Sequence, residues 1–223
     1  MDIPLHMNAA ANSFLLVYAG LFPIVNPVGG APIFLALTSS QSSAMRRDLA
    51  RRVALNGFLL LLGSLFVGSH VLVFFGITLP VVRIAGGLAV ASFGWRLLRE
   101  GAVAADNHSE AKQSQSVEAF YPLTMPLTVG PGSIAVAIAL GAQRPQEADG
   151  LADLAFLTAG ALVGLAAIAL SIFVCYRFAE RMVAFLGESG INVMIRLSAF
   201  ILLCIGIQII WSGYAALAGL PHP

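Results

Sequence analysis

Residues 22–32 read Phe-Pro-Ile-Val-Asn-Pro-Val-Gly-Gly-Ala-Pro, in the middle of an apolar segment long enough to cross a membrane. Three prolines and two glycines within eleven residues remove backbone donors and add flexibility, so no continuous helix is expected through residues 26–30. In a bilayer, broken backbone is tolerated only inside protein or around a wet cavity. The stretch therefore predicts a discontinuous helix and half of a solute-binding site, with a simple proline kink as the alternative.

The composition indicates a polytopic membrane protein. The chain is 58% hydrophobic and 10% charged, with a mean hydropathy of +0.88, against roughly 45–50% and about 25% in an ordinary globular domain. A net charge of +1 leaves no broad basic surface for nucleic acid. The N-terminus lacks the positive region of a signal peptide, so we expect the first apolar segment to be retained. Cys175 and Cys204 show no metal or redox spacing, and neither a metal nor a cofactor is expected.

Six apolar segments reach the length of about 20 residues that a membrane-spanning helix needs. We place them near residues 9–36, 53–76, 79–98, 119–141, 151–176 and 192–217. The polar stretch at residues 101–119 is rich in Ser, Gln, Ala and acidic residues and predicts a flexible cytoplasmic linker. The expected organisation is one integral membrane domain of two three-helix units, residues 1–100 and 120–223.

The positions of lysine and arginine predict the orientation. The loop at residues 38–52, the linker with its flanks and the loop after the fifth segment hold ten of the twelve basic residues, and the other side holds Arg83 and Arg144. Basic loops stay in the cytoplasm, so both termini are expected outside it.

The second half of the chain repeats the pattern of the first. A second cluster of helix breakers occupies residues 121–133, where residues 130–133 match residues 26–29, and residues 195–198 match residues 82–85. Three helices per half is an odd number, so the second half must enter the membrane from the opposite side. We expect an all-α protein of six transmembrane helices, arranged as two inverted repeats with helices 1 and 4 discontinuous. Such paired breaks point to a transporter's binding site near the bilayer midplane.

The two breaks predict how a small solute binds. A half-helix that starts inside the membrane presents free N–H groups and the positive end of its dipole, about half an elementary charge, which suits a carboxylate. Glycines let a ligand approach the backbone. Hydroxyl and amide side chains add neutral partners, with bonding to their own broken backbone as the alternative. The candidate substrate-binding residues are Asn26, Pro27, Gly29, Gly30, Thr124, Thr128, Gly130, Pro131, Gly132 and Ser133.

Charged residues are rare inside the apolar segments. Arg83 and Arg196 occupy matching helix starts and are candidates for gating or structural locks, with snorkelling to the interface as the alternative. No Asp or Glu falls in the middle of an apolar segment, which argues against a carboxylate proton relay and against a membrane enzyme. His70 is interpreted as an interfacial residue.

Small residues four apart predict close helix contacts within one protomer, and a homo-oligomer stays open. The pairs are Ser64 with Gly68, Gly87 with Ala91, and Gly160 with Gly164.

Several of these runs resemble the MarC family of bacterial and archaeal integral membrane proteins. They are residues 26–30, 76–88, 125–135 and 187–213. The resemblance covers nearly the whole chain and implies a six-helix inner-membrane protein of the lysine-exporter-like superfamily. It also implies a link to transport, because some relatives are described as transporters of small neutral amino acids such as glycine and alanine. Residues 85–87 are Ala-Gly-Gly but residues 198–200 are Ser-Ala-Phe, so glycine-dependent packing is expected to be asymmetric.

Together these features predict a secondary transporter that moves a small neutral amino acid or similar zwitterion by alternating access. The expected partners are a small-molecule solute and the lipid bilayer. In this hypothesis the two helix starts bind the carboxylate, Asn26 and Thr128 read the amino end, and the arginines lock the gates. The alternatives are a non-transporting scaffold or partner subunit whose breaks are repaired internally, and an exporter of another small solute. The substrate, the direction and the coupling ion stay open.

Overall fold

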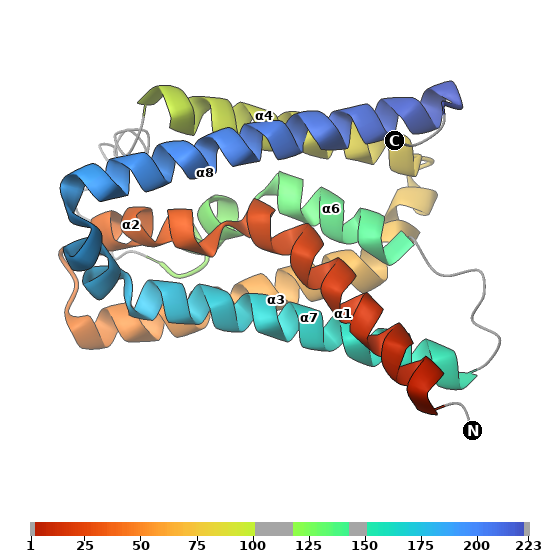
Figure 1. The fold of residues 1–223 in the computed structure, drawn as a ribbon, viewed down its shortest axis with the longest axis horizontal. Helices are drawn as coiled ribbons and strands as arrows, with labels where there is room; N and C mark the ends of the chain where they lie inside the picture. Colours follow the sequence, from red (N-terminus) through yellow and green to blue (C-terminus); the bar gives the residue numbers. More distant parts are fainter. Residues whose placement is uncertain (1–2, 101–117, 143–150, 221–223) are drawn as a thin grey trace.

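The computed structural model describes residues 3–100, 118–142 and 151–220, and all the regular elements of these residues are helices, as predicted. Figure 1 shows the long helices running roughly along one axis. The elements are α1 (Ile3–Val25), α2 (Pro27–Leu37), α3 (Ser43–Phe74), α4 (Leu79–Glu100), the π-helical η1 (Leu123–Thr128), α6 (Pro131–Ala142), α7 (Leu151–Arg177) and α8 (Ala179–Ala218). The predicted linker falls mostly on residues 101–117, which lie outside the described residues.

Five stretches of the described chain are long and apolar enough to cross a membrane. They are Met7–Leu37, Ser43–Phe74, Leu79–Arg99, Asp153–Arg177 and Ser189–Ala218. The fourth predicted crossing differs, because only α6 in it is α-helical, and its 12 residues extend about 18 Å at 1.5 Å per residue. That length falls short of a hydrocarbon core of roughly 30 Å. Five spans, the first of them interrupted at Asn26, and one interrupted fourth segment therefore occupy the six predicted crossings, of which the first and fourth were expected to be discontinuous.

Two helices start earlier than hydropathy indicates. α3 begins at Ser43 and α8 at Ala179, where the sequence predicted starts near residues 53 and 192. The Ser42 hydroxyl caps α3 by accepting a hydrogen bond from the Met45 N–H at 3.3 Å. The arginine- and alanine-rich turns that follow favour helix although they are polar. The apolar segments thus begin one or more turns after the helices do. Within α8 the chain also bends at Gly187, which has a φ of +64°.

α4 and α8 form an antiparallel pair with their backbones in direct contact (Figure 1). A Cβ atom on Gly87 would lie 2.7 Å from the Gly206 carbonyl oxygen, and one on Gly94 would lie 2.7 Å from the Leu203 nitrogen. On α8, a Cβ on Gly213 would lie 2.8 Å from the Pro80 carbonyl oxygen. In lipid the hydrophobic effect does not drive helices together, so close van der Waals packing at small residues stabilises the pair instead.

The other predicted small-residue pairs also lie at helix contacts within the protomer. Gly160 of α7 faces the backbone of Ala10 on α1, and Gly68 of α3 faces Ile138 on α6. These contacts hold α1 on α7 and α6 on α3, around a core that α3 and α7 share.

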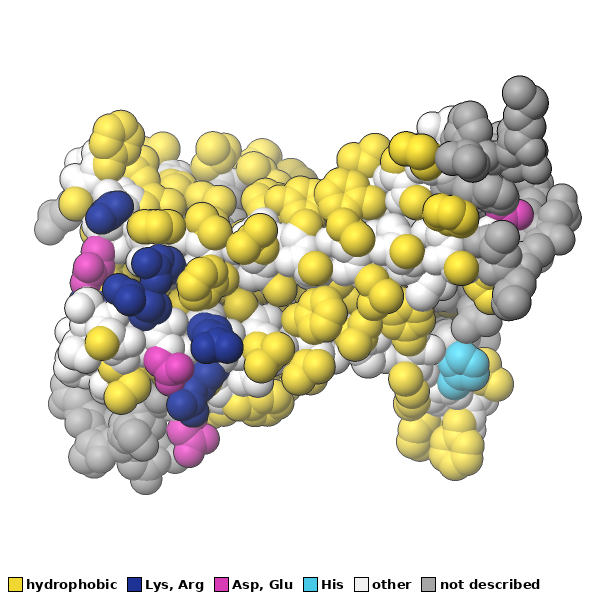
Figure 2. Space-filling view, turned by 90° about the horizontal axis from the view of Figure 1, so that it is seen from below, with side chains coloured by type: hydrophobic (Ala, Val, Ile, Leu, Met, Phe, Trp, Pro, Cys, Tyr) yellow, Lys and Arg dark blue, Asp and Glu magenta, His cyan; other side chains and the backbone are white. Residues whose placement is uncertain are grey.

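Arginine side chains gather at one end of the molecule, which we name the basic end. Figure 2 shows this group at one end of an otherwise largely apolar surface. α2, α4 and α7 end there and α3 and α8 begin there, whereas α1 begins and α8 ends at the opposite end (Figure 1). The arginines of these helix ends are Arg46, Arg47, Arg51, Arg52, Arg96, Arg99, Arg177 and Arg181. That the basic end faces the cytoplasm stays a prediction of the positive-inside rule.

The α4–α8 contact predicts that Gly206→Ala lowers stability. A Cβ there would clash with the backbone of Ala91, and overpacking of this kind costs about 1–3 kcal/mol. Thermal unfolding of the detergent-solubilised protein should therefore show a lower midpoint. Gly63→Ala is the matched control, because no atom lies within 4 Å of its Cβ position and alanine favours helix by up to about 1 kcal/mol. Equal midpoints for the two variants would contradict the glycine contact.

Candidate functional site

The first break lies at Asn26, between α1 and α2, as predicted. Asn26 adopts the left-handed conformation, with φ 46° and ψ 57°, which asparagine tolerates better than most residues. Its side-chain Oδ1 accepts a hydrogen bond from the Gly29 N–H at 3.1 Å, and its carbonyl oxygen accepts one from Gly30 at 2.9 Å. Pro27 occupies the first helical position, where no donor is lost. Asn26 is therefore the N-cap of α2, and its side-chain oxygen is turned to its own backbone.

The second break consists of η1 and the residues that separate it from α6. Pro122 and Pro126 have no N–H to donate, and the neighbouring amides bond five residues back, as in the 2.8 Å bond from Val129 N–H to the Thr124 carbonyl. Val129 has an extended backbone, and α6 then begins at Pro131. The chain thus passes through the interior as a widened turn followed by a fresh helix start.

Hydroxyl groups repair the broken backbone around η1. Thr124 donates to the Ala119 carbonyl at 2.7 Å, Thr128 to the Leu123 carbonyl at 2.7 Å, and Ser133 to the Gly130 carbonyl at 2.9 Å. All three side chains are buried. The alternative given for these residues, that they bond their own backbone, is thus present in the structure, and their hydroxyl oxygens retain acceptor capacity.

Tyr176 of α7 connects the two breaks. Its hydroxyl lies 2.8 Å from the Thr128 hydroxyl, and because Thr128 already donates its one proton to a carbonyl, Tyr176 is the donor. Its ring stacks on Phe34 of α2, with centroids 4.5 Å apart. A Cβ on Gly30 would lie 2.7 Å from the Tyr176 oxygen, so the glycine leaves room for the hydroxyl. Sequence reasoning missed Tyr176; its one signal was that a tyrosine hydroxyl in a membrane segment needs a partner.

A cavity of about 90 Å³ lies beside the second break. Five predicted site residues line it, namely Thr128, Gly130, Pro131, Gly132 and Ser133. Its remaining walls come from α1, α4, η1 and α8, through Ile24, Ala89, Val90, Phe93, Pro126, Leu127 and Leu202. Five predicted residues do not line it: Asn26, Pro27, Gly29, Gly30 and Thr124. We expected the two helix starts to face each other across one site. Only the start of α6 lines this cavity.

The difference between the two helix starts decides what this cavity is suited to bind. The Asn26 side chain already caps the start of α2. The start of α6 borders the cavity through Gly132 and Ser133, whose N–H groups lie in the first turn and at the positive end of the helix dipole. The cavity has no charged side chain in its lining. The positive end of the α6 dipole therefore lies at this side of the cavity, next to the hydroxyl oxygens of Thr128 and Ser133.

Arg83 and Arg196 lie away from this cavity. Arg83 is half-buried near the start of α4 and packs beside Gly213, whereas Arg196 is exposed on α8. A gating role for them stays a prediction. Among the described residues, no three His, Cys, Asp or Glu side chains gather as a metal site.

Long apolar helices with two interrupted segments in their midst define a polytopic helical membrane protein. The sequence matches the family described as MarC family integral membrane protein over residues 11–218, and the chain belongs to this family. It is a multi-pass inner-membrane protein, and the resemblance seen in the sequence is confirmed.

Two relatives illustrate the match. The UPF0056 inner membrane protein MarC of Escherichia coli strain K12 is 32% identical over 200 residues, which cover 86% of this chain and 90% of the relative. A UPF0056 membrane protein of Buchnera aphidicola subsp. Schizaphis graminum is 30% identical over 200 residues, with 90% of both chains covered. No solved structure matches the chain.

The contact between Gly30 and Tyr176 predicts a non-additive pair of substitutions. Gly30→Ala should destabilise the protein because its Cβ meets the tyrosine oxygen at 2.7 Å. Tyr176→Phe should cost about 1 kcal/mol for the lost hydrogen bond. In the double variant the nearest ring atoms lie 3.5 Å from the new Cβ, an ordinary contact. The unfolding free energies should therefore show a favourable coupling of about 1 kcal/mol or more. Strictly additive effects would show that Gly30 and Tyr176 do not constrain each other.

Proposed function

We propose that this protein is a secondary transporter that moves a small neutral amino acid, or a similar small zwitterion, by alternating access. The observation that carries the proposal is the meeting of the two interrupted segments. Tyr176 connects them, and the start of α6 opens onto a cavity beside them. Discontinuous helices at corresponding places in two halves of a chain are typical of solute sites in transporters.

The size and polarity of the cavity favour a small solute without net charge. Its volume of about 90 Å³ corresponds to roughly three water molecules at about 30 Å³ each, which suits a molecule of a few non-hydrogen atoms. A carboxylate would receive hydrogen bonds at the α6 start. An ammonium group would donate to the hydroxyl oxygens of Thr128 and Ser133, and Val90 and Phe93 would contact a short apolar side chain.

Helix packing supports an inverted repeat as the basis of the movement. Because residues 26–29 match residues 130–133, exchanging the two halves pairs α2 with α6, α3 with α7 and α4 with α8. Under this exchange the α2–α7 contact becomes the α6–α3 contact, the α4–α6 contact becomes the α8–α2 contact, and the α4–α8 and α3–α7 contacts map onto themselves. All of these helix pairs are in contact in the fold. Rocking of one repeat against the other around a shared site is a common form of alternating access.

The path from the cavity to the basic end is closed by apolar packing. Leu127 lines the cavity and also packs against a buried cluster of Ile33, Leu97, Ile195 and Ala199, contributed by α2, α4 and α8. The stacked rings of Phe34 and Tyr176 provide a second buried layer. In the proposed cycle this conformation is the one that is shut toward the basic end.

A non-transporting membrane scaffold is the second candidate. Its support is that Asn26, Thr124, Thr128 and Ser133 all bond their own backbone, which is the internal repair that a scaffold needs. The two candidates differ in whether a solute exchanges across the membrane.

Counterflow in liposomes tests the proposal. Purified protein should exchange labelled glycine or alanine across the membrane. Gly130→Leu should abolish the exchange, because its side chain would enter the cavity, where only the Pro126 carbonyl lies near the Cβ position. Asn26→Ala should slow exchange several-fold, since loss of an N-cap costs about 1 kcal/mol.

Gly63→Leu is the control for this experiment, because it adds the same bulk on an open face of α3. Absence of counterflow for every small neutral amino acid, with folded protein, would remove the substrate claim and favour the scaffold. Full activity of Gly130→Leu would show that the solute does not use this cavity.

A further inference from the structure

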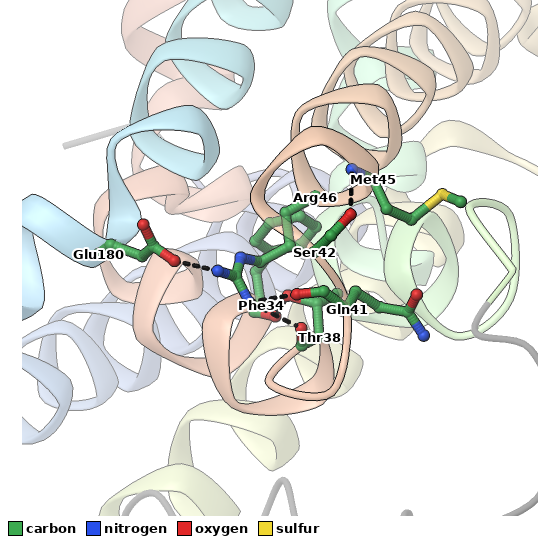
Figure 3. Close-up of polar contacts among 7 residues, drawn as sticks. All are labelled: Phe34, Thr38, Gln41, Ser42, Met45, Arg46 and Glu180. Atoms are coloured by element: carbon green, nitrogen blue, oxygen red, sulfur yellow. Dashed lines mark hydrogen bonds and ion pairs between the residues drawn. The ribbon is translucent and has the colours of Figure 1, made fainter.

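Arg46 lies at the centre of a polar cluster at the basic end (Figure 3). Its Nη1 donates hydrogen bonds to the Gln41 carbonyl at 2.7 Å and the Thr38 carbonyl at 3.2 Å. Its Nη2 forms an ion pair with the carboxylate of Glu180. The Arg46 side chain is 17% exposed and the Glu180 side chain 55% exposed. Arg46 is thus held on two sides by fixed carbonyls and on a third by a hydrated carboxylate.

This ion pair connects the two halves of the chain. Arg46 lies in the first turn of α3, and Thr38 and Gln41 belong to the loop that joins α2 to α3. Glu180 lies in the first turn of α8, where the helix dipole favours a negative charge. By contrast, the pair of Arg52 with Asp48 lies within one helix. The Arg46–Glu180 contact therefore resists separation of the first turn of α8, which precedes the bend at Gly187, from the end of α2.

The cluster also connects to the closed path above the cavity. Thr38 is fully buried, and its hydroxyl donates to the Phe34 carbonyl at 2.7 Å. Phe34 stacks on Tyr176, and the Tyr176 hydroxyl donates to Thr128 at the second break. A continuous series of contacts thus runs from Arg46 to the wall of the cavity.

We infer that the Arg46–Glu180 ion pair is the lock of a gate at the basic end, which breaks when the cavity opens to that side; this inference rests on the proposed function. Its composition suits a reversible contact. When α8 moves away, Arg46 keeps both carbonyl acceptors, and Glu180 is already half in water, so neither charge is left buried and unpaired. The pair is open to water on its Glu180 side, and ion pairs that water reaches are weak, so this one can open without a large barrier.

Thiol labelling tests the lock without any solute. In a background of Cys175→Ala and Cys204→Ala, Leu127→Cys places a reporter between the cavity and the closed path. A membrane-impermeant maleimide is added to either side of oriented vesicles, and Arg47→Cys, at an exposed position next to Arg46, identifies the side of the basic end. We expect Glu180→Gln and Arg46→Ala to raise labelling of the reporter from that side by about threefold or more. Loss of even a weak lock raises the ratio of open to closed protein by this factor, and labelling follows the open population. Arg47→Ala should leave labelling unchanged.

Glu180→Gln keeps the carbonyl contacts of Arg46, so it gives a result even where Arg46→Ala fails to fold. Unchanged labelling in folded Glu180→Gln would overturn the lock, as would an equal rise from both sides, which indicates a loosened fold. Increased labelling from the basic side without counterflow of any amino acid would support the lock and remove the amino-acid claim. Counterflow with unchanged labelling would remove the lock alone.

Discussion

A bilayer offers no water to a broken backbone, and this constraint shapes the centre of the molecule. At the first break, the Asn26 side chain caps α2 by accepting a hydrogen bond from the Gly29 N–H. At the second break, π-helical hydrogen bonds and the hydroxyls of Thr124, Thr128 and Ser133 provide partners for the backbone groups. The polar side chains nearest the breaks are therefore already committed to structure. What the cavity retains for a solute is one helix start and the spare acceptor capacity of hydroxyl oxygens.

The two breaks differ in how tightly they are packed. The first is tightly packed, because Gly30 lies against the hydroxyl of Tyr176 and Phe34 lies against its ring. The second borders the cavity. Under the proposed function, a solute at the α6 start would act on Thr128, whose partner Tyr176 contacts the first break. Binding of a solute at the second break would thus alter the contacts of Tyr176 with the first break.

The sequence predicted the membrane class and the positions of both breaks, because clustered prolines remove backbone donors and clustered glycines disfavour helix at fixed places along the chain. It did not predict the true starts of α3 and α8, since both helices begin before their apolar segments do. It also missed Tyr176, whose hydrogen-bond partner lies 48 residues away, and the ion pair of Arg46 and Glu180, which joins residues 134 apart. Contacts of this range depend on how the helices pack, and no local pattern encodes them. Which residues bind substrate stays a prediction for the same reason.

The glycine contact between α4 and α8 also limits how the protein can move. At the glycine contacts the two backbones touch directly, so a slide of one residue would bring a Cβ against the opposite helix, and the pair is expected to travel as one rigid body. The cavity lies along the edge of that body, with Val90 and Leu202 on the rigid side and Ile24 and Pro131 on the other. A shear between the rigid pair and the remaining helices would therefore change the volume of the cavity.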